Sequence, residues 1–152
     1  MANSENKPTS IPQVNNPQGL AEMLNLIMQG QKTKKELNLV LHLEDREFSY
    51  RIAALQFFNL ISKSAKRPTT WSWSQVKSES SGTNSASAEK ILRKAIEAWN
   101  TNELGLRDSG NSEYEIWQAL SSSKFKKVGV KTMARRVSSY KSLVHWALER
   151  EK

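Results

Sequence analysis

One segment of the sequence concentrates the side chains that could bind an anion. Residues 121–142, SSSKFKKVGVKTMARRVSSYKS, contain seven Lys or Arg residues and no Asp or Glu. Lys and Arg neutralise phosphates, and Ser hydroxyls donate hydrogen bonds to them. The chemistry that this segment predicts is phosphate binding, and the alternative is an ordinary solvated face.

A helix from about Lys131 to Arg150 would carry most of these residues. At about 100° per residue, its apolar side chains fall within an arc of about 100°, which is wide enough to pack on the rest of the protein. The opposite arc of about 80° holds cations and small hydroxyls over roughly 20 Å of helix. Such a stripe suits the sugar-phosphate backbone of a nucleic acid and not its base edges. We call the following residues the outer stripe: Lys131, Arg135, Ser138, Ser142 and His145.

Further cations extend the candidate surface. Lys63, Lys66 and Arg67 precede Trp71 and Trp73, which project to one side if the chain is extended there. Their rings could stack on unpaired bases or, in the more common arrangement, hold this segment against the core. Three other tryptophans lie within helical apolar patterns and are expected to be core or rim residues: Trp99, Trp117 and Trp146. The complete set of predicted nucleic-acid-binding residues is Lys124, Lys126, Lys127, Lys131, Arg135, Arg136, Ser138, Lys141, Ser142, Lys63, Lys66 and Arg67.

Gly129 followed by a basic helix is also typical of a helix-turn-helix, whose second helix enters the major groove of DNA. With Gly129 as the turn glycine, the five positions that the motif buries, only two of them apolar here, are Lys124, Val128, Val130, Arg135 and Ser138. Each polar side chain buried without a partner would cost a few kcal/mol. A helix-turn-helix-like DNA-binding regulator from a plasmid or phage therefore stays an alternative. An adaptor whose apolar groove binds a partner helix is a third hypothesis.

Residues for catalysis or metal binding are scarce. Two Asp, two His and no Cys leave few members for a two-metal carboxylate site and none for a Cys-based zinc site. No glycine-rich phosphate loop occurs among the six glycines. His42, close to Glu44 and Asp45, is more typical of a structural helix end than of an acid–base group. We expect no enzymatic activity, no metal and no cofactor.

Size and charge point to a polyanionic partner. The chain has 152 residues, the usual size of one domain, and a formal net charge of +8. It contains no run of about 18 apolar residues, and its N-terminus lacks the basic and apolar regions of a signal peptide. We expect a cytoplasmic protein that does not associate with membranes.

Apolar periodicity predicts an all-α protein. After a flexible N-terminal arm at residues 1–17, apolar residues at three- and four-residue spacing from Gly19 mark an amphipathic helix. The stretch ELNLVLHLED, residues 36–45, fits both a strand and a helix, and helix is favoured because its neighbours are helical. Residues 45–66 are predicted to form one helix, and their run IAALQFFNLI, residues 52–61, has only Gln56 and Asn59 as polar members. Apolar groups therefore occupy nearly the whole circumference there, which predicts a central helix buried on several sides.

The second half of the chain is predicted to contain a long loop and then three helices. Residues 69–88 contain seven serines and little periodicity, which indicates a loop that is either functional or disordered. Ser87 is placed to cap a helix that begins at Ala88, and Ser112 opens a capping box before a short helix. We expect a single bundle of five or six helices over residues 18–152.

Two stretches of this small, basic, Cys-free chain, RIAALQFFNLISKSAKR and KTMARRVSSYKSLVHWALEREK, give it a family resemblance. Over about residues 19–152 the chain resembles the small subunit of CRISPR-Cas class 1 effector complexes. In some type I systems that subunit is translated from an internal start in the large-subunit gene. The resemblance implies a helical bundle without enzymatic activity, present in several copies in a Cascade-like ribonucleoprotein. There it would contact other subunits and hold guide RNA, target strand or displaced strand without sequence specificity.

Overall fold

The computed structural model of the protein describes residues 16–65, 67–73, 85–107, 110–121, 125 and 127–149. Within these ranges the chain is mostly helical, with six α-helices, a π-helical turn (η2) after α4 and a small three-stranded antiparallel sheet. The all-α prediction is therefore correct for the helices and wrong in excluding strands. The elements are α1 (Pro17–Met28), β1 (Lys32–Thr33), α2 (Lys34–Leu41), α3 (Asp45–Phe57), β2 (Ile61–Lys63), β3 (Thr70–Trp73), α4 (Ser85–Ala98), η2 (Trp99–Glu103), α5 (Glu113–Leu120) and α6 (Val130–Leu148).

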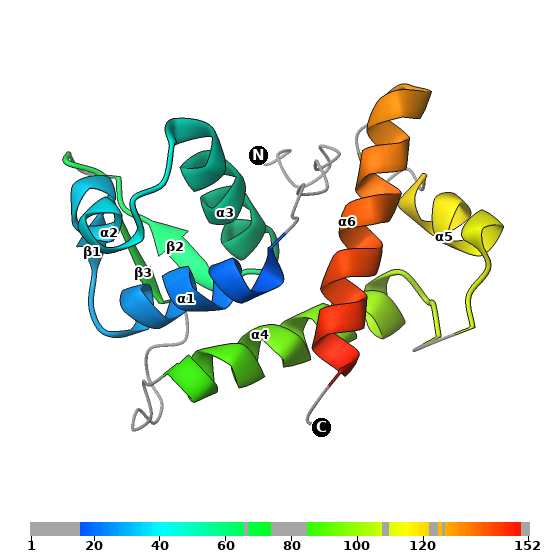
Figure 1. Ribbon diagram of the computed structural model, residues 1–152, viewed down its shortest axis with the longest axis horizontal. Helices are drawn as coiled ribbons and strands as arrows, with labels where there is room; N and C mark the ends of the chain where they lie inside the picture. The colour runs from blue at the N-terminus through cyan, green and yellow to red at the C-terminus, as the bar shows by residue number, and fades with distance from the viewer. Residues whose placement is uncertain are drawn as a thin grey trace, which may run out of the picture.

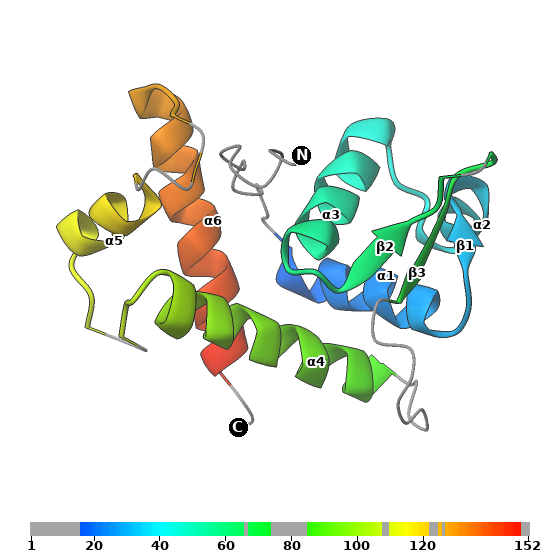
Figure 2. The same cartoon turned by 180° about the vertical axis from the view of Figure 1, so that it is seen from behind.

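Helix α4 connects two groups of elements (Figures 1 and 2). The N-terminal group, within residues 16–73, contains α1, α2, α3 and the sheet. The C-terminal group, within residues 110–149, contains α5 and α6, and α6 crosses the second half of α4. The buried apolar side chains of both groups and of α4 form one continuous cluster.

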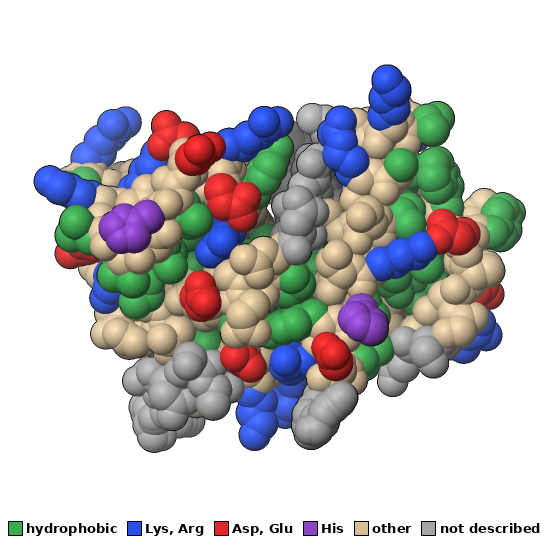
Figure 3. Space-filling model, in the orientation of Figure 1, with side chains coloured by type: hydrophobic (Ala, Val, Ile, Leu, Met, Phe, Trp, Pro, Cys, Tyr) green, Lys and Arg blue, Asp and Glu red, His purple; other side chains and the backbone are tan. Residues whose placement is uncertain are grey.

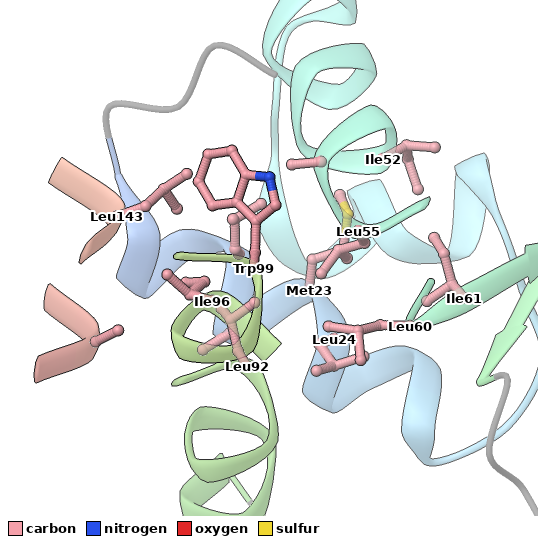
Figure 4. Packing of buried hydrophobic residues seen from close by; sticks show 14 of the residues in the cluster. Met23, Leu24, Ile52, Leu55, Leu60, Ile61, Leu92, Ile96, Trp99 and Leu143 are labelled. Carbon is pink, nitrogen blue, oxygen red and sulfur yellow. The ribbon is translucent and has the colours of Figure 1, made fainter. Parts of the chain in front are cut away.

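The central helix of the fold is α1, and not the helix predicted at residues 45–66. Leu20, Met23 and Leu24 are 0% exposed because α1 packs against α3, α4 and β3. Figure 4 shows Met23 beside Leu55 of α3, and Leu24 beside Leu60. At its N-terminus, the side chain of Asn16 accepts the N–H of Gly19 at 3.1 Å and caps the helix.

Helix α3 ends at Phe57, well before the predicted end at residue 66. Asn59 adopts the left-handed conformation, with φ of 60°, and the N–H of Leu60 donates to the carbonyl of Leu55 at 3.0 Å. This is a Schellman motif, which ends many helices, and Asn is one of the few residue types that tolerate its left-handed position. The apolar run that predicted one long helix is therefore divided between α3 and β2.

The sheet has the strand order β1-β3-β2, so its centre is formed by residues predicted as part of the loop at 69–88. Trp71 and Trp73 lie on the same face of β3 and pack against the core. The ring of Trp71 meets the ring of Phe48 edge-on, with centroids 5.6 Å apart. The two tryptophans hold the strand against the core, which confirms the more common of their two expected roles.

Other predicted elements are confirmed with small shifts. Of the ambiguous stretch at 36–45, residues 36–41 lie in helix α2, which opens with a capping box between Thr33 and Glu36, and Asp45 begins α3. Ser112 and Glu115 form the predicted capping box of α5. Helix α6 closely matches the last predicted helix.

Two predicted segments lie largely outside the described residues. The arm predicted at 1–17 is described only from Asn16 onward. Of the loop predicted at 69–88, residues 74–84 are not described, and α4 begins at Ser85, earlier than predicted.

Candidate nucleic-acid interface

Helix α6 begins with an N-terminus that is open to an anion. Its N-cap residue is Gly129, which has no side chain to accept an N–H of the first turn, and that turn contains no Asp or Glu. The first four N–H groups of a helix have no intrahelical acceptor, and the helix dipole adds partial positive charge there. A phosphate oxygen can therefore bind at this end of α6.

The outer stripe faces away from the core, as the helical periodicity predicted. Lys131, Arg135, Ser138 and His145 are exposed, and Ser142 is half-buried. Figure 3 shows Lys and Arg side chains on the N-terminal end of α6. The cationic part of the stripe is thus its first half, next to the open N-terminus. The side of α6 that packs on the protein consists of Met133, Arg136, Val137, Ser139, Tyr140, Leu143, Val144 and Ala147.

The cations at the start of α6 have no acidic partner among the residues that the structure describes. Within the described part of the chain, Lys127, Lys131 and Arg135 form no ion pair. Their charges are therefore available to a ligand. The described ion pairs all lie elsewhere and join Lys34 to Asp45, Arg51 to Glu47, Arg93 to Glu89, Arg107 to Glu115 and Lys141 to Glu113.

Two residues of the predicted surface interact within the protein: one is buried, and the other forms an ion pair. Arg136 is only 3% exposed, and desolvation lowers the pKa of its guanidinium from the ordinary value. The expectation that Arg136 lies on the outer surface is corrected, because at about 140° from Lys131 it falls among the packed residues. Lys141 forms its ion pair with Glu113 and thereby links α6 to α5.

The structure separates the two predicted groups of cations. Lys63 and Arg67 are exposed at the β2–β3 hairpin, on the opposite side of the molecule from α6 (Figures 1 and 2). In the sheet register, Lys63 and Lys32 flank Trp71 from the two neighbouring strands. The hairpin cations and Lys131 therefore belong to different surfaces. Three further predicted residues, Lys66, Lys124 and Lys126, lie outside the described residues, and their roles stay predictions.

Two hollows beside α6 were not predicted from the sequence. The larger, of about 690 Å³, lies between α5 and the C-terminal half of α6, with Ile116 and Val144 among its lining residues. The smaller, of about 360 Å³, lies at the start of α6 and is lined in part by Trp117, Lys127 and Val130. The sequence does contain a signal for these hollows. Aromatic and aliphatic side chains occur on the polar side of α5 and at the start of α6.

The packing of α6 differs from that of a standard helix-turn-helix. Val130 is 73% exposed, and Arg135 and Ser138 are exposed as well, although the motif would bury all three. The register set by Gly129 therefore does not give the expected turn and recognition helix.

Neither a cluster of metal-binding side chains nor a membrane-spanning helix occurs among the described residues. No three His, Asp or Glu side chains among them lie close enough together to hold a metal ion. None of the described helices is both long and apolar enough to cross a bilayer.

No family model matches the chain, no curated protein matches it in sequence, and no solved structure matches its fold. A function for this protein has to rest on the chemistry of its own surface.

Proposed function

We propose that the protein is a non-catalytic nucleic-acid-binding subunit that holds a sugar-phosphate backbone on the first half of α6. The observation that carries this proposal is that Lys127, Lys131 and Arg135 are exposed and form no ion pair with any described residue, next to the open N-terminus of α6. Lys131 and Arg135 are one turn apart, about 6 Å along the helix axis, and the hydroxyl of Ser138 continues the line. Groups in a row along a helix suit a chain of phosphates better than a single anion.

Contacts of this kind give affinity without base specificity. Lys, Arg and helix N–H groups bind phosphate oxygens, which are the same for every base sequence. The net charge of +8 would raise the association rate with any nucleic acid at low salt. The proposed activity is therefore to hold a strand in place, without cofactor or chemistry.

The resemblance to CRISPR-Cas class 1 small subunits supplies a finer proposal. In that setting the protein is one of several copies in a cytoplasmic Cascade-like ribonucleoprotein and holds guide RNA, target strand or displaced strand. The mostly helical fold and the exposed apolar side chains Leu39, Val40 and Tyr114 support contacts with other subunits. The stretch 51–67 departs from a purely helical subunit, because it forms the end of α3 followed by β2.

Charge reversal on the outer stripe tests the proposal. Lys131→Glu with Arg135→Glu should weaken binding to random-sequence oligonucleotides at least tenfold at low salt, because two phosphate contacts become repulsive. The matched control is Lys90→Glu with Lys94→Glu, which makes the same change in net charge at the same spacing on the exposed side of α4. Fluorescence anisotropy at several salt concentrations measures affinity, and circular dichroism verifies that both variants keep their helices.

The control decides what a loss of affinity means. Equal losses in both double variants would show that only net charge matters, and the proposed site on α6 would be wrong. Absence of binding by the wild-type protein, alone and in its assembled complex, would overturn the function itself. A preference of about a thousandfold for one palindromic duplex would instead establish the DNA-binding regulator.

A further inference from the structure

Four of the five tryptophan rings are used within the protein. Two are buried in the core and one is half-buried against it, and the fourth stacks on the guanidinium of Arg93 at 4.1 Å. The indole N–H of that fourth ring also donates to Oε1 of Gln18 at 3.3 Å. These four residues are Trp71, Trp99, Trp73 and Trp146.

Trp117 is different from the other four. It projects from α5, is 36% exposed, and its ring contacts no other aromatic ring or cation within the described part of the chain. Tyr114, one helical turn earlier, is 72% exposed. Large aromatic side chains that remain exposed on a small domain commonly mark a binding surface.

Trp117 borders the smaller hollow, of about 360 Å³, at the start of α6. The other walls of this hollow include the apolar side chains of Phe125, Val130 and Met133 and the cationic side chain of Lys127. An aromatic plane beside apolar walls and a cation suits a flat ring that is joined to an anion. An unpaired nucleotide has this combination.

We infer that Trp117 stacks on an unpaired base of a single-stranded nucleic acid whose phosphates lie on Lys127 and on the first half of the outer stripe. The inference rests on the proposed function and deepens it, because it names single strands as the preferred ligand. Val130 and Met133 line the hollow and belong, with Lys131, to the first turn of α6. A base in the hollow and a phosphate on Lys131 would thus be bound within one turn of helix.

The geometry of the ligand distinguishes single strands from duplexes. In a duplex each base is paired and stacked between neighbours, so its face is not accessible to Trp117 unless the base is flipped out. A single strand presents base faces together with its phosphates, and base–aromatic stacking depends little on sequence. Trp117 should therefore contribute to single-strand binding alone, whereas the outer stripe should contribute to both.

The experiment uses three oligonucleotides of equal length: a single strand, a single strand with abasic sites throughout, and a duplex. The abasic strand keeps the phosphates and lacks the bases. Trp117→Leu keeps an apolar side chain and removes the aromatic plane, and Trp117→Phe restores a smaller plane. Tyr50→Leu is the matched control, because it makes the same aromatic-to-leucine change on α3 in the N-terminal group, where the ring of Tyr50 lies 5.8 Å from the guanidinium of Arg46.

We expect Trp117→Leu to weaken binding of the single strand by about fivefold to 150-fold, which corresponds to one stacked base. Its affinity for the abasic strand and for the duplex should equal that of the wild type. Trp117→Phe should recover part of the loss, and Tyr50→Leu should bind all three ligands as the wild type does.

Each other outcome overturns the inference. If Trp117→Leu binds the single strand as tightly as the wild type while the charge-reversal variant has lost binding, stacking is wrong and the proposed function stands. If Trp117→Leu loses affinity for the abasic strand and the single strand equally, Trp117 supports the fold of the phosphate surface and not a base. If the wild-type protein binds none of the three ligands, both proposals fail.

Discussion

The two groups of elements on either side of α4 are packed in different ways. In the N-terminal group, α1 is enclosed by α3, α4 and the sheet, and Leu24 on it is 0% exposed. In the C-terminal group, α5 and α6 pack on each other along one face, and hollows of about 690 and 360 Å³ lie beside them. A helix that is enclosed on several sides contributes to stability, and one that is covered on a single side can also present residues to a ligand.

Among the described residues, some cations of the N-terminal group are already bound within the protein, unlike those at the start of α6. In the N-terminal group, Lys34 pairs with Asp45, and Arg51 binds both Glu47 and the carbonyl of Gly19. At the start of α6, the exposed cations of the outer stripe have no such partner among the described residues. Lys63 and Arg67 of the N-terminal group also form no ion pair among the described residues, so pairing alone does not separate the two groups. The first half of α6 is the better candidate for an interface because its cations lie in a row beside an open helix N-terminus.

The same substitution in each group should reveal the difference in packing. Leu24→Ala in α1 should destabilise the protein toward the upper end of the range of about 2–5 kcal/mol, because its neighbours leave a closed cavity. Leu120→Ala in α5 should cost less, near 2 kcal/mol, since Leu120 is also 0% exposed but borders the smaller hollow. Urea denaturation measures both free energies of unfolding. An equal or larger cost at Leu120 would show that the two groups are packed equally tightly.

The junction between α6 and η2 contains a buried hydrogen bond. The hydroxyl of Tyr140 in α6 donates to Oδ1 of Asn100 at 2.5 Å, and Nδ2 of Asn100 donates to the carbonyl of Arg107 at 3.1 Å. Tyr140→Phe leaves the Asn100 oxygen buried without this donor and should destabilise the protein by about 1–3 kcal/mol. Tyr114→Phe, which changes an exposed hydroxyl, is the control and should cost almost nothing in the same thermal unfolding experiment. Similar losses of stability from the two substitutions would show that this hydrogen bond does not stabilise the junction.

The smallest effect is expected for the ion pair between Lys141 and Glu113. Both side chains are at least half exposed, so a double-mutant cycle with Lys141→Ala and Glu113→Ala should give a coupling of about 1 kcal/mol or less. This coupling should decrease with added salt. Because Lys141 is already paired, Lys141→Ala should weaken oligonucleotide binding less than Lys131→Ala does. The reverse order of the two affinities would place Lys141 in the interface and Lys131 outside it.

Predictions from the sequence succeeded where one helix contained the whole signal. The side of α6 on which the outer stripe lies was predicted correctly, because angular position depends only on the helical repeat, about 100° per residue. The same rule places Arg136 on the packed side, so its burial could have been predicted if the angle had been applied to every cation. The capping box at Ser112 was also correct, because both partners lie within one turn.

Most predictions that failed concern features that depend on residues distant in the sequence, and one failed for a local reason. The strands have between two and four residues, too few for a clear alternation, and β1 and β3 pair through Lys32 and Trp71. The long helix predicted at 45–66 failed for a local reason, because the left-handed Asn59 ends α3 and apolar periodicity does not detect such a turn. The hollow beside Trp117 could not be predicted, because its walls come from α5, α6 and the segment between them.

The sequence by itself determined the helices, their amphipathic faces and the cationic side of α6, because these follow from local repeat and capping. The tertiary structure decided which cations are available and which surfaces they share. It separated Lys63 and Arg67 from α6, paired Lys141 with Glu113 and left Trp117 exposed beside a hollow. Distance between side chains from different elements is set by the packing of the whole chain, and no local pattern contains it.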